Sequence, residues 1–155
     1  MASQRFLKNV QNVLNAYSDR KRYWKLAEGW ELFPAAKRVI DEFSGLAIGI
    51  HHDPDLPRCP TSVSIDPNSA VKYFLDDESP FTLVDGTKLY PLGLTAENQV
   101  FMFIDEKGVV YGEGVRGTHM IAPTFDQALI RLINGETYWQ DKDAKVHIPR
   151  RPFES

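Results

Sequence analysis

Two strand-like segments joined by a short turn restrict the fold of this chain more than any other feature of its sequence. Residues 99–104 and 109–112 are rich in β-branched and aromatic side chains, which favours strands. Residues 105–108 between them end in Gly108, the residue type that a tight turn needs at a positive φ angle. This pattern predicts an antiparallel hairpin, and a third strand is predicted over residues 88–94.

Apolar residues in the first part of the chain recur every three to four positions, a period typical of amphipathic helices. Helices are predicted over residues 3–18 and 34–43, and Gly45 follows the second helix as a left-handed stop. A third helix is predicted over residues 125–134. The shorter elements expected are helical segments at 20–26 and 69–75 and strands at 46–50 and 61–65.

The length of the chain and the order of its elements define the expected fold class. A chain of 155 residues can form a single domain around one core. Helices come first, strands interrupted by a helix follow, and a helix comes last. This order indicates an α+β domain with a mainly antiparallel sheet flanked by helices. Residues 1–140 are expected to form this domain, and residues 141–155 a polar C-terminal tail.

Targeting signals and cysteine content indicate where the protein is expected to act. The sequence has neither the roughly 20-residue apolar run of a membrane helix nor the continuous apolar stretch of a secretory signal. Cys59 is the single cysteine and cannot form an internal disulfide, which fits a reducing compartment. A cytoplasmic protein without a membrane partner is therefore expected.

Charge is distributed unevenly along the chain, although the net charge is only −3. Residues 1–40 hold eight Lys/Arg and three Asp/Glu, whereas residues 41–126 hold five Lys/Arg and fourteen Asp/Glu, a local charge of −9. The acidic middle repels nucleic acid and suits a basic protein partner, although it could also simply keep the surface solvated. Residues 20–24 mix basic and aromatic side chains, but we expect a solvated helix face with Trp24 packed inward and no nucleic-acid partner.

Candidate catalytic, cofactor and metal residues are few, and none is predicted to be functional. His51 and His52 would point to opposite faces of a strand, so they would not converge on a metal. The basic neighbour of Cys59 could lower its pKa slightly, but nothing in the sequence fixes a histidine beside it. Residues 112–117 resemble a dinucleotide fingerprint, yet they follow a strand without opening a helix and are predicted to be a flexible turn.

Several motifs, taken in order, resemble the third immunity branch of the SUKH superfamily. They are an aromatic and Pro-Ala-rich helix start (29–36), a Phe-Ser-Gly-Leu stop (43–46), a Pro-hydrophobic-Gly strand (89–93), a strand-turn-strand unit ending in Gly-x-x-Tyr (100–111), and a closing helix that ends in glycine (125–135). Ser44 stands where that family typically has a glycine. The resemblance covers roughly residues 25–136, and the order and spacing of the motifs carry it.

The resemblance implies an α+β fold and a function as a bacterial immunity protein. Such proteins bind a toxin, often a nuclease, and block its active site without catalysing a reaction. It thus implies a cognate toxin domain as the partner, and the acidic middle suggests that this domain is basic. Two alternatives remain: an intracellular scaffold or regulatory module, as in other SUKH branches, and a small hydrolase that uses Asp or Glu.

Acidic residues in predicted loops are the candidates for contact with a basic toxin, because loop side chains can reach a partner without supporting the core. Two aromatic residues just past the last helix could add an anchor. The alternative is that these aromatics cap the core and that the carboxylates only solvate the surface. The predicted partner-binding residues are Asp53, Asp55, Asp76, Asp77, Glu78, Tyr138 and Trp139.

Overall fold

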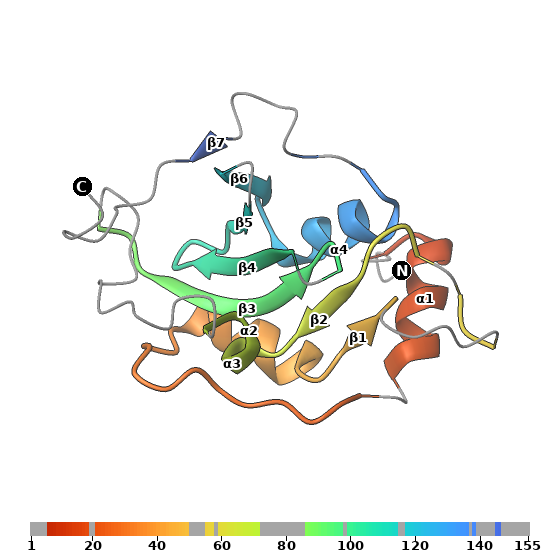
Figure 1. Cartoon of the computed structure of the whole chain (residues 1–155), viewed down its shortest axis with the longest axis horizontal. Helices are drawn as coiled ribbons and strands as arrows, with labels where there is room; N and C mark the ends of the chain where they lie inside the picture. The colour runs from red at the N-terminus through yellow and green to blue at the C-terminus, as the bar shows by residue number, and fades with distance from the viewer. Residues whose placement is uncertain are drawn as a thin grey trace, which may run out of the picture.

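In the described part of the chain, a seven-stranded antiparallel sheet forms the centre of the fold, and each strand pairs with the next one in sequence (Figure 1). The structure is a computed structural model that describes residues 6–18, 21–49, 55–57, 59–71, 86–97, 99–114, 117–136, 138 and 145–146. The strands are β1 (Ala47–Ile48), β2 (Val63–Ile65), β3 (Leu89–Thr95), β4 (Val100–Asp105), β5 (Val110–Gly114), β6 (Gly117–Ala122) and β7 (Lys145–Val146).

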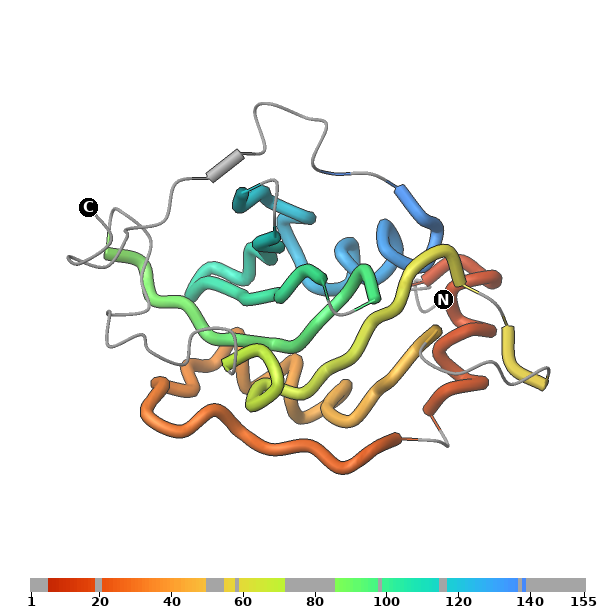
Figure 2. The backbone as a smooth tube through the Cα atoms, viewed as in Figure 1, coloured from red at the N-terminus to blue at the C-terminus, as the bar shows by residue number. Residues whose placement is uncertain are grey.

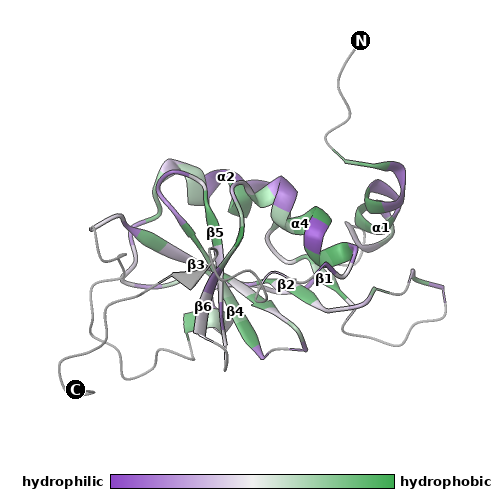
Figure 3. Cartoon of the chain, turned by 90° about the horizontal axis from the view of Figure 1, so that it is seen from above, coloured by the Kyte–Doolittle hydropathy of each residue, from purple (hydrophilic) through white to green (hydrophobic). Residues whose placement is uncertain are grey.

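Three helices cover one face of this sheet, as the view from above shows (Figure 3). They are α1 (Lys8–Ser18), α2 (Pro34–Phe43) and α4 (Phe125–Ile133), and a short helix, α3 (Pro67–Val71), packs against β3. Helix α2 contacts β3 and β4, α4 contacts β6, and α1 contacts α4. The result is a single α+β domain with a mainly antiparallel sheet, as predicted.

Alternation along the strands divides the sheet residues between two apolar clusters. The main core lies between the sheet and the helices, and Met102, Ile104 and Val110 belong to it. On the opposite face, Phe103 stacks on Tyr111 of the next strand with ring centroids 5.8 Å apart, and Leu89 completes a smaller buried cluster. Tertiary burial on both faces explains why β3 is buried along its whole length.

Gly93 allows β2 and β3 to approach each other closely. The pairing of β3 with β4 shifts register between Pro91 and Gly93, which is a local irregularity in an otherwise regular ladder. A side-chain carbon at Gly93 would lie 1.8 Å from the carbonyl oxygen of Ser64 in β2. A residue without a side chain is therefore required at this position.

The predicted turn between β4 and β5 is present, and a buried carboxylate organises it. Asp105 is 1% exposed, and its Oδ1 accepts hydrogen bonds from the backbone N–H groups of Lys107 (2.8 Å) and Val109 (3.0 Å). Its Oδ2 accepts a hydrogen bond from the Tyr111 hydroxyl at 2.8 Å. Gly108 has φ 95°, the positive value that was predicted for it. This turn therefore ties the hairpin to the second apolar cluster.

The predicted elements are largely confirmed, with small shifts in their ends. Helix α2 has the predicted bounds, α4 ends one residue earlier than predicted, and α1 is described from Lys8. The three predicted strands correspond to β3, β4 and β5, and the two short predicted strands contain β1 and β2. Helix α3 begins two residues before the prediction, and residues 72–75 lie outside the described residues.

Three predictions differ from the structure. Residues 21–26 are not helical, because their backbone is held by hydrogen bonds to distant residues, among them Gly45 and Asp66. The glycine-rich run 112–117 contributes the end of β5 and the start of β6, a strand that was not predicted. The sheet also extends into the predicted tail, where β7 pairs with β6.

Among the described residues, no helix is both long and apolar enough to cross a membrane.

Candidate partner-binding surface

The structure describes only one of the acidic residues predicted to contact a partner. Asp55 is exposed, in agreement with a position at the surface. Asp53, Asp76, Asp77 and Glu78 lie outside the described residues, so their arrangement around Asp55 stays a prediction.

The two predicted aromatic anchors have different outcomes. Trp139 lies outside the described residues, whereas Tyr138 is 4% exposed and belongs to the main core. Its ring lies edge-on to that of His119, with centroids 6.5 Å apart. A side-chain carbon at Gly112 would be 2.8 Å from the Tyr138 hydroxyl, so the glycine provides the space for that ring. The burial of Tyr138 agrees with the alternative interpretation, that it caps the core, while a contact with a partner stays a prediction.

Burial of Tyr138 leads to a prediction about stability at alkaline pH. Burial raises the pKa of Tyr138 to about 12, from an ordinary value near 10. Folding therefore favours the neutral phenol. The stability that this buried phenol contributes is complete below pH 10 and is lost as pH rises from 10 to 12. Over that pH interval, the free energy of unfolding of Tyr138→Phe should fall by about 2 kcal/mol less than that of the wild type. Urea unfolding at several pH values measures this difference. Tyr23→Phe is the matched control, since Tyr23 is 81% exposed. Equal losses in the wild type and Tyr138→Phe would contradict the prediction.

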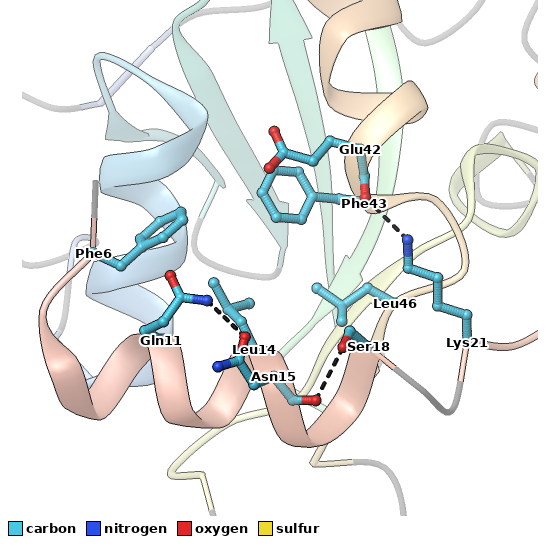
Figure 4. Close-up of a pocket in the computed structure, with 9 residues that line it drawn as sticks. All are labelled: Phe6, Gln11, Leu14, Asn15, Ser18, Lys21, Glu42, Phe43 and Leu46. Carbon is cyan, nitrogen blue, oxygen red and sulfur yellow. Dashed lines mark hydrogen bonds between the residues drawn. The ribbon is translucent and has the colours of Figure 1, made fainter. Parts of the chain in front are cut away.

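A cavity of about 200 Å³ lies between α1 and the C-terminal end of α2 (Figure 4). We call it the α1–α2 groove. Apolar side chains from three parts of the chain form its walls, and polar side chains surround them. The apolar residues are Phe6, Leu14, Phe43 and Leu46, and the polar residues are Gln11, Asn15, Ser18, Lys21 and Glu42. A site of this composition can accept an apolar side chain and offer hydrogen bonds around it.

Residues 21–26, here called the basic strap, continue from the groove, because Lys21 belongs to both. The strap is extended and runs alongside β1 and α2 (Figure 2). Its aromatic residues have opposite orientations: Trp24 packs against the main core, as predicted, while Tyr23 is 81% exposed. Leu26 is also 45% exposed. The basic and aromatic composition of this segment was visible in the sequence, but its extended backbone depends on distant partners and was missed.

Metal-binding and nucleophilic chemistry find little support in the described residues. Within them, no three His, Cys, Asp or Glu residues are close enough together to hold a metal ion. His51 and His52 lie outside this part of the chain. Burial raises the pKa of the half-buried Cys59 thiol, the opposite of the small decrease considered from its basic neighbour. A raised pKa keeps the thiol protonated and less nucleophilic at neutral pH.

A comparison with protein-family models matches most of the chain. The family model of the SUKH-3 immunity protein matches residues 4–135, most of the chain. The chain belongs to the SUKH-3 immunity protein family. The match confirms the resemblance drawn from the motifs, and it assigns this SUKH-3 protein to a toxin-neutralising role with a toxin as its partner. No curated protein and no solved structure gives a match.

The family match also bears on which surfaces belong to the SUKH-3 domain. The matched residues run from before α1 to the end of α4, so they include the α1–α2 groove and the basic strap. Asp53, Asp55 and residues 76–78 lie within the match, whereas Tyr138 and Trp139 follow it. The acidic candidates and the groove are thus parts of the SUKH-3 domain itself.

Proposed function

We propose that this SUKH-3 protein is a non-enzymatic inhibitor that binds the catalytic domain of one bacterial nuclease toxin and blocks its active site. The observation that carries the proposal is the local charge of −9 over residues 41–126, within the match to an immunity family. A nuclease needs a basic groove to hold phosphate groups. A carboxylate-rich protein can occupy that groove and can be steered toward it over long distances.

The acidic loops are the proposed contact surface for the nuclease. Its residues are Asp53, Asp55, Asp76, Asp77 and Glu78. The exposure of Asp55 supports the proposal, because an interface carboxylate must be accessible in the free protein. Loop carboxylates can be exchanged between related inhibitors without disturbing the core, which suits an inhibitor that is specific for one toxin.

The proposal is tested first by the neighbouring gene, which should encode a toxin, and then with the nuclease domain of that toxin. The wild-type protein should suppress its nuclease activity at equimolar concentration. Charge reversal in Asp76→Lys/Asp77→Lys should slow association at low salt on the order of tenfold and reduce the salt dependence of the rate, because charges at an interface rim act mainly on association. Stopped-flow fluorescence at several salt concentrations measures both quantities.

A matched control variant separates the effect of charge in the acidic loops from the effect of the net charge of the protein. Glu28→Lys/Glu136→Lys changes the net charge by the same amount, reverses two exposed carboxylates outside the acidic middle, and should leave the association rate nearly unchanged. Unfolding midpoints should stay close to that of the wild type in all variants, because the proposed contact charges are expected at the surface, where charges contribute little to stability. An unchanged association rate for the double variant would show that the toxin binds elsewhere, and failure of the wild type to bind would contradict the function itself.

A further inference from the structure

We infer that the basic strap and the α1–α2 groove form a second interaction surface, whose partner is an acidic protein segment bearing aliphatic side chains. This surface is basic, whereas the proposed nuclease contact is acidic. The inference therefore does not depend on the proposed nuclease partner. Three properties of the described residues support it: a fixed backbone, unpaired cations and exposed apolar groups beside an apolar recess.

Hydrogen bonds along its length fix the strap, although it has no regular secondary structure. The Arg22 N–H donates to the carbonyl oxygen of Gly45 at 2.7 Å, and the Lys25 N–H donates to Asp66 Oδ1 at 3.2 Å. The Lys25 carbonyl accepts from the Asn68 N–H at 3.1 Å. A segment that is already ordered loses less conformational entropy when a partner binds.

Gly45 provides the close contact between the strap and the end of α2. It has φ 84°, and a side-chain carbon there would lie 2.6 Å from the Arg22 carbonyl oxygen and 3.2 Å from Trp24 Cδ1. The inward packing of Trp24 against Gly45 leaves Tyr23 facing solvent. The outward orientation of Tyr23 is therefore a consequence of the packed structure beneath it.

The strap carries three cations and no carboxylate. Lys21, Arg22 and Lys25 are all exposed. Lys21 Nζ donates to the carbonyl oxygen of Glu42 at 3.0 Å, where it satisfies a group at the end of α2 and keeps its charge. Among the described residues, no carboxylate forms an ion pair with the side chain of Arg22 or Lys25. These two cations are available to carboxylates of a partner.

Exposed apolar groups indicate that the partner is a protein and not a nucleic acid. Tyr23 and Leu26 are 81% and 45% exposed, and the adjoining groove has apolar walls that include Leu14 and Phe43. Aliphatic side chains fit such a recess, whereas a phosphate backbone offers nothing to bury there. Nucleic-acid sites that lack sequence preference instead use several aromatic residues along a basic groove.

The test uses a fluorescein-labelled peptide in which Asp and Leu are dispersed among Ser, with fluorescence anisotropy as the measurement. The comparison peptides replace every Asp by Asn or every Leu by Ser, and an oligodeoxythymidine of equal charge is the nucleic-acid probe. We expect the Asp-Leu peptide to bind at least about fivefold more tightly than each of the other probes, a difference of about 1 kcal/mol.

Surface variants locate the binding. Tyr23→Ala and Lys25→Glu should each weaken binding of the Asp-Leu peptide about fivefold or more, whereas Lys107→Glu, an equal change of net charge in the β4–β5 turn, should not. All three positions are exposed, so circular dichroism and unfolding midpoints should stay at wild-type values. The inference is overturned by absent binding, by tighter binding of the oligonucleotide, or by equal effects of Lys25→Glu and Lys107→Glu.

Discussion

Gly93→Ala should destabilise the protein by about 4 kcal/mol or more, one of the largest effects expected from a single methyl group. The added carbon would lie 1.8 Å from the carbonyl oxygen of Ser64 and 2.8 Å from its carbonyl carbon. Both are backbone atoms, so no side-chain rotation can relieve the overlap, and β2 and β3 must separate. Domains of this size are stable by about 5–15 kcal/mol, so the loss can prevent folding altogether.

The measurement is the urea unfolding midpoint, with far-ultraviolet circular dichroism as the readout if the variant does not fold. Gly108→Ala is the matched control: Gly108 also has a positive φ, 95°, but a side-chain carbon there would meet no atom within 4 Å. We expect it to cost only about 1 kcal/mol, from backbone strain alone. Similar losses in the two variants would show that β2 does not approach Gly93 as closely as described.

Asp105→Ala should destabilise the protein by about 3–5 kcal/mol, because it removes the acceptor of three hydrogen bonds at a buried position. The Tyr111 hydroxyl would then lose this hydrogen-bond acceptor within the smaller buried cluster. Tyr111→Phe removes only the hydroxyl and should cost about 1–2 kcal/mol. Chemical denaturation of both variants gives these free energies.

The double variant shows how far the two residues act together. Because the hydroxyl bonds directly to the carboxylate, the coupling free energy in a double-mutant cycle should be about 1–3 kcal/mol. Lys107→Ala, an exposed position in the same turn, should change stability by less than about 0.5 kcal/mol. Additive effects of Asp105→Ala and Tyr111→Phe would contradict the described hydrogen bond.

Local sequence patterns were sufficient to predict most of the fold. The turn ending in Gly108 and the apolar strands around it can be recognised from neighbouring residues, so the hairpin of β4 and β5 could be predicted directly. Helix α2 was equally clear, because Pro34 marks its first turn and Gly45 follows its end. These signals arise within a few residues and need no knowledge of the tertiary structure.

Elements fixed by distant contacts could not be predicted in this way. Strand β6 contains His119 and Thr118, which are buried although they are polar, so its alternation is weak. The strap resembled a short helix because its extended backbone is determined by Gly45 and Asp66, neither of which is near it in sequence. The burial of Tyr138 likewise depends on Gly112, in the middle of β5 and distant in sequence.

Of the two candidate surfaces, one was indicated by the sequence and the other was revealed only by the structure. Acidic composition suggested a basic partner, and this was apparent from residue counts alone. The groove, in contrast, joins Leu14 of α1 to Phe43 of α2 and Leu46 beyond it. Sequence spacing does not bring such residues together, so the groove required the structure.

The two outermost strands have a consequence for how partners can be recognised. Among the described residues, β1 and β7 hold two residues each, so these two outermost strands themselves offer few free backbone N–H and C=O groups. Long unpaired edges invite strands of other chains to add to a sheet, and very short edge strands are a common protection against aggregation. An extended peptide therefore gains little by adding to β1 or β7 as another strand. A partner that approaches these two strands must be recognised by side chains, whose identity can change while the backbone of the sheet stays the same.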